Sequence, residues 1–213
     1  MFIRQILAGL RVLLALTILL GVLYPLGVWV VSRIPGLQAN AEGSVVTVDG
    51  RAVGSDLIGI DPVAKDPDND PWFHNRPSAV AKDLDGDGSA DVLGPADPSI
   101  SAGSNKGAFD QDLVATVKAR MEIIAKREDV PESRVPADAV TASASGVDPG
   151  ISVAYAELQV PRVARVTGLA QDRVRALVEE HTDGRGIGIL GEPGVNVLKL
   201  NLAVQAAISW GQS

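Results

Sequence analysis

The sequence predicts an α+β fold in which a single N-terminal transmembrane helix precedes one extracytoplasmic domain of mixed helices and strands. Three observations predict this fold. Residues 12–32 carry no charge, two β-rich runs flank an Asp-Gly pair at 49–50, and apolar residues recur at helical spacing in the second half of the chain. The 213 residues leave room for about one ordinary domain after the membrane helix.

The membrane helix is predicted from Val12 to Ser32. These 21 residues are uncharged, and as a helix they span roughly 32 Å, about the thickness of the bilayer hydrocarbon. Arg11 and Arg33 flank the run, and a tryptophan near its far end suits the membrane interface. The alternative is a cleavable signal peptide, because residues 39–41 (Ala-Asn-Ala) resemble a cleavage site. The apolar run is longer than the roughly 7–15 residues of a signal core, which favours the anchor.

The charges that flank this helix predict its orientation. Residues 1–11 contain Arg4 and Arg11 and no acid, whereas acidic residues follow soon after Arg33. An excess of Lys and Arg keeps a flanking segment in the cytoplasm. We therefore predict that residues 1–11 are cytoplasmic and that residues 33–213 form an extracytoplasmic domain.

Composition and charge exclude several classes of function. All 26 acidic residues but only 16 of the 19 Lys and Arg residues lie after position 33, so the predicted outer domain has a formal charge of −10. Such a domain repels nucleic acid and anionic lipid. The chain has no cysteine and only two histidines, which excludes thiol catalysis, thiolate metal sites and multi-histidine metal sites.

Inside the predicted membrane helix, Gly21, Tyr24 and Pro25 interrupt the apolar run. Pro25 lacks a backbone N–H and predicts a kink, and small residues let a second helix approach closely. We interpret this group as a helix-packing surface. The alternative is that glycine and proline are simply more frequent in membrane helices.

The first part of the outer domain predicts strands and loops. Residues 44–60 contain two β-rich runs on either side of Asp49-Gly50, which predicts a hairpin. Residues 61–71 are rich in proline and aspartate and predict a loop. Residues 72–78 (WFHNRPS) place two aromatic side chains beside Arg76, which suggests a docking surface or a buried clamp, with ordinary core aromatics as the alternative.

The second half predicts three helices before the C-terminal segment. The first begins after the capping residue Asp110 and runs to about Arg127. Its buried face is predicted to comprise Leu113, Val117, Met121 and Ile124. The second helix begins after Ser152 and contains Pro161, where we expect a kink or a break. The third covers roughly residues 171–182, with Val174, Leu177 and Val178 facing inward.

The C-terminal segment predicts two short strands and a final helix. The apolar residues between 187 and 190 suggest one strand, residues 195–200 suggest another, and residues 201–210 suggest the helix. Residues 186–191 also match the pattern GxGxxG. They follow a polar turn rather than a strand, so tight turns are a better interpretation than a dinucleotide site.

Residues 82–98 are acidic and contain a pattern that resembles the start of a calcium loop. Asp83, Asp85, Asp87 and Asp91 alternate around a glycine, which could bring carboxylates together on a hard cation. The twelfth position, where calcium loops carry a bidentate glutamate, is Gly94. Two interpretations therefore remain: weak calcium binding by these four aspartates, or a solvated acidic loop.

Motifs of catalysis are missing from the sequence. It contains no GxxxxGK[ST] phosphate loop, no GxSxG and no Asp-Lys-Thr-Gly-Thr, so the chain cannot itself form the aspartyl-phosphate of a P-type pump. We expect no catalytic residues in this chain.

Several motifs in order resemble one family. The membrane helix contains Gly-Val-Leu-Tyr-Pro at 21–25, and later segments read Phe-His-Asn-Arg-Pro-Ser at 73–78, Ser-Ala-Gly-Ser-Asn at 101–105, Ser-Gly-Val-Asp-Pro at 145–149 and Gln-Val-Pro-Arg at 159–162. Over nearly its whole length the chain resembles the C subunit of the bacterial Kdp-type potassium-transporting ATPase. Residues 83–98 look like an insertion that the family generally lacks.

The resemblance implies an accessory, non-hydrolysing subunit of a potassium importer in the bacterial inner or plasma membrane. It implies two partners, a channel-like subunit that carries the ion and a P-type subunit that hydrolyses ATP. It also implies a catalytic chaperone that raises the ATP affinity of the P-type subunit, with ATP and Mg²⁺ bound there and no cofactor intrinsic to this chain. A standalone membrane-anchored binding module, dependent on calcium, is the alternative.

The resemblance also nominates residues for contact with partners. These interaction candidates are Gly21, Tyr24, Pro25, Phe73, Arg76, Pro77, Ser104, Asn105, Asp148, Pro149, Gln159, Pro161 and Arg162.

Overall fold

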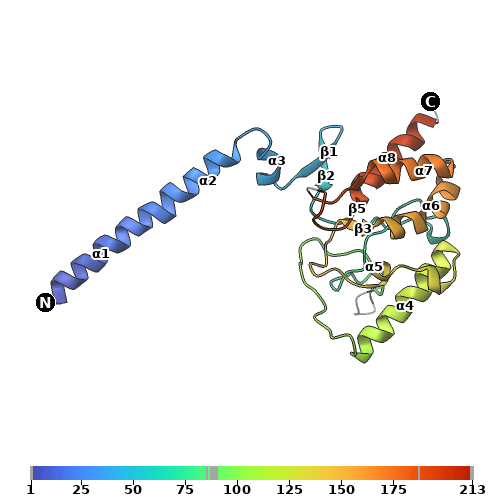
Figure 1. The fold of residues 1–213 in the computed structure, drawn as a ribbon, viewed down its shortest axis with the longest axis horizontal. Helices are drawn as coiled ribbons and strands as arrows, with labels where there is room; N and C mark the ends of the chain where they lie inside the picture. The colour runs from blue at the N-terminus through green and yellow to red at the C-terminus, as the bar shows by residue number, and fades with distance from the viewer. Residues whose placement is uncertain (1, 85, 87–90, 187, 212–213) are drawn as a thin grey trace. The chain divides into compact units, whose positions relative to one another are not determined.

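The computed structural model describes residues 2–84, 86, 91–186 and 188–211. The chain divides into two compact units, residues 1–45 and residues 46–213, and each is described here by itself. Figure 1 shows the N-terminal unit as an extended run of helix and the second unit as a mixture of helices and short strands. The second unit confirms the predicted mixed α+β class.

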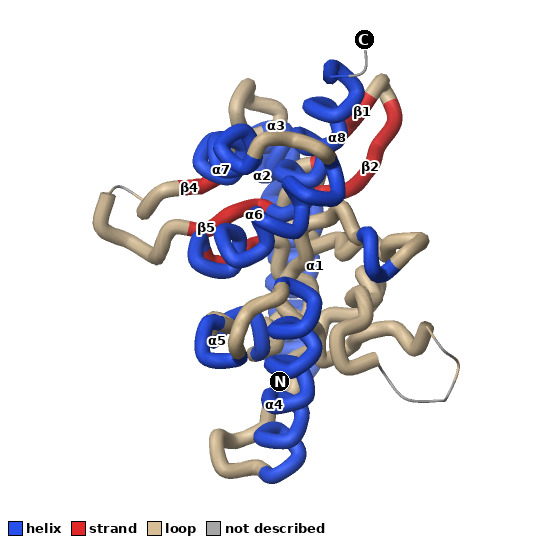
Figure 2. The backbone as a smooth tube through the Cα atoms, turned by 90° about the vertical axis from the view of Figure 1, so that its right-hand side faces the viewer, coloured by secondary structure: helices blue, strands red, loops and turns tan. Residues whose placement is uncertain are grey.

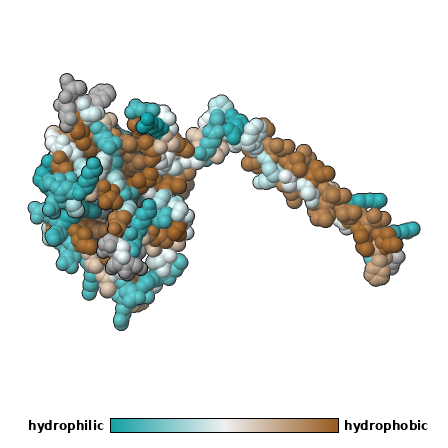
Figure 3. Space-filling view, turned by 180° about the vertical axis from the view of Figure 1, so that it is seen from behind, coloured by the Kyte–Doolittle hydropathy of each residue, from teal (hydrophilic) through white to brown (hydrophobic). Residues whose placement is uncertain are grey.

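The N-terminal unit consists mainly of one long apolar helix. It comprises α1 (Phe2–Ile18), the π-helical turn η1 (Leu19–Leu23) and α2 (Tyr24–Ser32), followed by the short helix α3 (Gln38–Ala41). The 31 residues from Phe2 to Ser32 are long and apolar enough to cross a membrane, and none of that stretch is buried. Figure 3 shows hydrophobic side chains along most of this helix. The helix is therefore longer than its uncharged part at 12–32.

A kink was predicted at Pro25, and the structure has a π-helical turn, η1, directly before this residue's segment. The amide of Tyr24 donates to the carbonyl of Leu19, five residues back instead of four, and Pro25 then lies in the first turn of α2. A proline is tolerated there because the first amides of a helical segment have no partner in that segment. The widened turn lets the helix pass the proline without ending.

The predicted hairpin is confirmed. Strands β1 (Val45–Val48) and β2 (Arg51–Ser55) are neighbours in a two-stranded sheet. Asp49 and Gly50 join them with φ values of 49° and 75°. Positive φ at both central residues is the geometry of the tight hairpin turn that Asp-Gly favours.

Loops follow the hairpin and cover one side of the domain, as the tan tube in Figure 2 shows. Among the described residues of this stretch, the one helical element before α4 (Gln111–Glu128) is the short 3₁₀ turn η2 (Pro67–Asn69). The side chain of Asp110 accepts from the amide of Leu113 and caps α4, as predicted. Helix α4 ends at Asp129, which takes a left-handed φ of 54°. The turn η3 (Glu132–Arg134) and the short helix α5 (Ala137–Val140) follow.

Helices α6 (Val153–Thr167) and α7 (Gln171–Glu180) confirm the next two predictions. The Ser152 side chain caps α6 through the amide of Tyr155, and Gly168 closes it with a φ of 76°. Of the kink or break expected at Pro161, the break does not occur, because α6 continues through this residue. Pro161 is exposed while Val160 and Arg162 are buried on either side. Packing of these neighbours holds the helix together despite the missing hydrogen bond.

The second sheet has three strands in the order β3-β5-β4. Strand β5 (Gly194–Asn196) lies in the centre and pairs antiparallel with β3 (Gly150–Ser152) and with β4 (Thr182–Asp183). Ile151 lies opposite Val195, and both side chains are buried. This pair joins two segments that are far apart in the sequence.

Two predictions for the C-terminal segment need correction. No strand forms in the described part of 187–190: Gly186 and Leu190 make one isolated bridge, Ile189 is exposed, and Ile187 lies outside the described residues. The strand predicted at 195–200 ends at Asn196, and helix α8 (Val197–Gly211) begins at once. The Asn196 side chain accepts from the amide of Lys199, which caps the helix and ends the strand.

The hydrophobic core gathers side chains from α4, α6, α7, α8 and the three-stranded sheet. Its largest fully buried apolar members are Tyr155, Phe73, Ile124 and Leu200. Phe73 lies in a loop, and its side chain packs in the hydrophobic core. This packing holds the loop of residues 72–78 against the core.

Candidate functional site

Arg162 is the centre of a buried polar network that joins α4, α6 and the loop before Phe73. Its Nε donates to both carboxylate oxygens of Glu128, at 3.1 and 2.9 Å. Its Nη1 donates to the carbonyls of Asp70 and Trp72, at 2.7 and 2.9 Å. A buried guanidinium with this many acceptors is well satisfied. Arg162 therefore fixes the position of residues 70–72 against the two helices.

Arg127 extends the network toward solvent. Its Nε donates to Glu128 at 2.7 Å, and its Nη2 donates to the hydroxyl of Tyr155 at 3.0 Å. Burial lowers the pKa of Arg127, but the nearby Tyr155 oxygen and Glu128 carboxylate outweigh it and raise that pKa. Burial raises the pKa of the Tyr155 hydroxyl, and the charge of Arg127 opposes this. Both groups keep their protons at neutral pH.

Two amide side chains hold the backbone of Phe73 and His74. Asn201 of α8 accepts from the amide of Phe73 at 2.8 Å and donates to its carbonyl at 2.9 Å. Gln159 of α6 accepts from the amide of His74 at 2.8 Å and donates to its carbonyl at 3.3 Å. Each amide therefore mimics the pairing of a neighbouring β-strand. The loop is clamped to two helices through its main chain.

His74 lies between two aspartates at the ends of the proline-rich loop. Its Nδ1 is 3.0 Å from Asp61 Oδ1, and its Nε2 is 2.6 Å from Asp70 Oδ2. Ionised carboxylates only accept hydrogen bonds, so a ring with protons on both nitrogens is the form that donates to both. The imidazole thereby links the two ends of residues 61–70.

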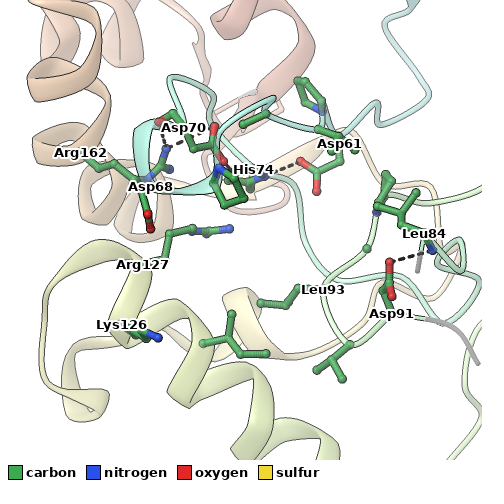
Figure 4. Close-up of a pocket in the computed structure, with 18 of the residues that line it drawn as sticks. Asp61, Asp68, Asp70, His74, Leu84, Asp91, Leu93, Lys126, Arg127 and Arg162 are labelled. Carbon is green, nitrogen blue, oxygen red and sulfur yellow. Dashed lines mark hydrogen bonds and ion pairs between the residues drawn. The ribbon is translucent and has the colours of Figure 1, made fainter. Parts of the chain in front are cut away.

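These residues form one wall of a cleft of about 910 Å³ (Figure 4). The loop around His74 faces the C-terminal part of α4, where Lys126 and Arg127 lie, and Leu93 lies on a third side. Val63 and Ile123 add exposed apolar surface. The cleft thus combines apolar walls with charges of both signs. Asp61, His74, Asp70 and Arg162 are paired with one another, so their main effect is to shape the loop.

A second group of residues, which we call the motif cluster, brings together segments 73–78, 101–105 and 143–149. The amide of Ser143 donates to the carbonyl of Pro77 at 3.3 Å, and the hydroxyl of Ser101 donates to the carbonyl of Ser145 at 3.0 Å. A Cβ placed on Gly146 would lie 2.6 Å from the carbonyl oxygen of Ala102. The three segments are therefore in direct contact.

Arg76 and Asp148 form the charged part of the motif cluster. Arg76 Nη1 donates to Asp148 Oδ2 at 3.3 Å, and Nη2 donates to the carbonyl of Thr141 at 3.4 Å. Both bonds are long, and both side chains of the ion pair are partly exposed. The adjacent Asn75 is buried, and neither polar atom of its side chain has a partner among the described residues. Arg76 is thus held by long hydrogen bonds and is partly exposed.

The interaction candidates divide into buried and exposed groups. Phe73, Pro77, Gln159 and Arg162 are buried inside the domain, where they hold the loop. The remaining candidates of the second unit are exposed or partly exposed: Arg76, Ser104, Asn105, Asp148, Pro149 and Pro161. Gly21, Tyr24 and Pro25 are exposed on the long helix.

The sequence did not indicate the partners of these residues. The helix was predicted to run to about Arg127, but its last residue is Glu128, whose carboxylate is buried. Asp70, Asp61 and Asn201 were not singled out either. The sequence did contain one signal: Glu128 follows Arg127 at the end of an amphipathic helix, where an acidic side chain can point inward. Nothing in the sequence identified Arg162 as its partner.

The aspartates of the calcium hypothesis are only partly covered by the structure. Asp85 and Asp87 lie outside the described residues. The Asp91 carboxylate accepts from the amide of Leu84 at 3.1 Å, and the Asp83 carboxylate accepts from the amide of Gly86 at 2.7 Å. Among the residues that the structure describes, no group of three potential metal ligands occurs. Calcium binding stays a prediction.

Comparison with known proteins gives consistent matches. The family described as "KdpC: K+-transporting ATPase, c chain" matches residues 6–206. The potassium-transporting ATPase KdpC subunit of Kineococcus radiotolerans is 45% identical over 204 residues, which cover 96% of this chain and 94% of that protein. The KdpC subunit of Rhodopseudomonas palustris is 42% identical over 204 residues, covering 96% and 98%. That of Mycobacterium tuberculosis is 42% identical over 203 residues, covering 94% and 97%.

These matches extend from the long apolar helix into α8, so they include both units of the structure. The chain therefore belongs to the KdpC family, the c chain of K+-transporting ATPases, and its apolar N-terminal helix is a membrane anchor.

Proposed function

We propose that this chain is the accessory, non-hydrolysing subunit of a high-affinity, ATP-driven potassium import complex. The observation that carries the proposal is the long helix of 31 residues, whose apolar part is not buried within the chain itself. Such a surface requires lipid or another protein around it. The family match and the missing motifs of ATP hydrolysis support an accessory role.

Two partners follow from the family. We infer that one is a channel-like subunit that carries potassium and the other a P-type subunit that hydrolyses ATP. The helix packs against the channel-like subunit through the face of Gly21 and Pro25. A Cβ added to Gly21 would meet only Thr17 Cγ2, at 3.9 Å, so the surface there is open to a neighbouring helix.

The second unit then lies on the extracytoplasmic side, over the ion entrance. The segment before the helix contains Arg4 and Arg11 and no acidic residue, and this excess of positive charge supports a cytoplasmic N-terminus. The formal charge of −10 on the outer residues raises the local concentration of cations within about 8–10 Å of the surface. This placement separates the domain from cytoplasmic ATP. A catalytic-chaperone effect, in which the subunit raises ATP affinity, would then act through the partner that binds ATP and Mg²⁺.

Purification of the complex tests the proposal. A tagged chain is isolated from mildly solubilised membranes of potassium-starved cells, and co-purifying proteins are identified by mass spectrometry. We expect two large membrane proteins in fixed proportion, one with an Asp-Lys-Thr-Gly-Thr site. Gly21→Leu should reduce their yield, while Gly9→Leu, in α1 and also in open space, serves as the matched control. A chain that elutes alone would overturn the proposal and favour a standalone module.

Calcium binding by residues 83–91 is a separate proposal. Titration calorimetry of the purified chain at millimolar calcium should give a binding heat that Asp91→Asn weakens. Asp97→Asn, a partly exposed carboxylate beyond positions 83–94 of the predicted calcium loop, is the control. No calcium-dependent heat would remove the proposal.

A further inference from the structure

The carbonyl of Leu20 has no amide partner within the membrane helix. Its regular partner four residues on is the amide of Tyr24, which donates to Leu19 instead. Its partner in π-helical geometry, five residues on, is Pro25, which has no N–H. The amide of Leu23 belongs to the same π-turn, whose bonds run five residues back, to Ile18. The amides of Leu23 and Tyr24 therefore pair with other carbonyls, and Pro25 has no amide hydrogen to donate to the carbonyl of Leu20.

No side chain compensates for this within the described residues. None of the side-chain hydrogen bonds of the described chain ends on Leu20, and the residues of the π-turn are all apolar and exposed. Gly21, directly after Leu20, has no side chain to cover the main chain. Leu20 also lies near the middle of the uncharged stretch at 12–32, away from the water at either boundary.

A bare carbonyl at this depth is costly, because the bilayer core offers no water to pair with it. Membrane helices that contain proline tolerate the loss when a neighbouring helix supplies a donor. We propose that the Leu20 carbonyl is an intramembrane docking point, and that it accepts a hydrogen bond from a hydroxyl or carboxamide side chain on a membrane helix of a partner subunit. The inference rests on the proposed function, since it needs such a partner.

The proposal makes the π-turn a recognition feature. The helix around it is mostly apolar, and packing of apolar side chains is weakly selective because lipid chains are equally apolar. An unpaired acceptor at a fixed depth specifies where along the helix a polar side chain must lie. Gly21 lets that partner helix come close enough to reach the carbonyl.

Carbonyl NMR of the full chain tests the proposal directly. Labelling with 1-¹³C-leucine and ¹⁵N-glycine marks four Leu-Gly pairs in the sequence: 20–21, 26–27, 93–94 and 190–191. Spectra are compared for the chain inside the purified complex and the chain alone in the same detergent. We expect the Leu20 carbonyl signal to move downfield in the complex, as a new hydrogen bond requires. Leu26, in the regular part of α2, is the internal control and should not move.

Pro25→Ala provides the second arm. Alanine restores an amide that can pair with the free carbonyl, so the variant should lose the downfield change. It should also weaken co-purification by about threefold to tenfold, the range expected for one hydrogen bond between membrane helices. Pro35→Ala removes a proline after the long helix has ended and is the matched control, expected to behave as wild type.

The outcomes separate the two proposals. If the complex assembles but Leu20 has the same shift in both states, the docking point is refuted while the accessory function stands. A downfield Leu20 signal already present in the isolated chain would also refute it, because detergent or water then supplies the donor. If no partner co-purifies, the proposed function itself fails.

Discussion

Arg162 and Glu128 form an ion pair in which a single nitrogen, Nε, lies within 3.1 Å of both carboxylate oxygens. The Glu128 side chain is 0% exposed and that of Arg162 only 3%. The pair joins α6 to α4, and the remaining donors of Arg162 fix the loop that leads to His74. The domain thus uses a buried ion pair, in addition to the packing of Phe73, to set the shape of this loop.

Arg162→Met should destabilise the domain by about 3–5 kcal/mol, because it breaks a buried ion pair and leaves Glu128 with Arg127 as its remaining partner. It also takes the donor away from the carbonyls of Asp70 and Trp72. The double variant Arg162→Met, Glu128→Gln should recover part of the loss by removing that carboxylate. Urea unfolding of the full chain in detergent, followed by tryptophan fluorescence, measures the effect. Arg165→Met, one turn further along α6 and exposed, should stay within about 0.5 kcal/mol of wild type. Equal losses for Arg162 and Arg165 would contradict this assignment.

Gly146→Ala should destabilise the motif cluster by more than backbone strain alone. Gly146 has a φ of 74°, and an added Cβ would lie 2.6 Å from the Ala102 carbonyl oxygen. Gly168 has a φ of 76° with no atom within 4 Å of such a Cβ, so Gly168→Ala measures the strain by itself, about 1 kcal/mol. The two losses are compared by thermal unfolding. If they are the same, the contact between segments 101–105 and 143–149 is looser than the structure indicates.

The domain should lose stability as the pH falls into the acid range. Burial raises the pKa of Asp70, but the hydrogen bond and charge of His74, with the Trp72 amide and Arg162, outweigh it and lower that pKa from 3.8. A carboxyl with a lowered pKa in the folded state stabilises the fold above its unfolded pKa, and this stabilisation disappears as pH falls through the folded pKa. Asp70→Asn should therefore flatten the decline of the unfolding free energy below about pH 4. Asp68→Asn, exposed in the same loop, is the control.

Pro161→Ala should stabilise the domain by about 1–2 kcal/mol. Pro161 removes one hydrogen bond from the interior of α6, which costs up to about 3 kcal/mol, and alanine gains conformational freedom in the unfolded chain that offsets part of the benefit. The same unfolding assay measures the change. Pro193→Ala, in the exposed loop before β5, gives a comparison without a helix. A destabilised Pro161→Ala variant would mean that the proline ring itself packs favourably.

The elements that could be predicted from the sequence are those with local signals. The Asp49-Gly50 turn, the Asp110 cap and the inward face of α7 each depend on residues a few positions apart. The buried network depends on pairs at long separation: Arg162 and Glu128 are 34 residues apart, and Asn201 and Phe73 are 128 apart. No pattern within a helix or a loop identifies such partners.

The errors also have physical causes. Apolar residues near 187–190 suggested a strand, but Gly188 and Gly191 take φ values of 80° and 78° and turn the chain, which leaves Ile189 and Leu190 exposed. The strand predicted at 195–200 was too long, because the apolar residues from Val197 onward suit the buried face of a helix as well as a strand. The feature that distinguishes helix from strand here is the Asn196 side chain, which accepts a hydrogen bond from the amide of Lys199 and so caps the helix.

The position of β5 has a consequence for the order in which the domain folds. This strand is central in its sheet, yet it is made after β3, β4 and every helix except α8. During synthesis β3 and β4 have nothing to pair with until Gly194–Asn196 has emerged. Pairing over such sequence distances is slow, because a long loop must close first. With the orientation proposed above, a nascent chain held open in this way crosses the membrane as an unfolded polypeptide and completes its sheet on the far side.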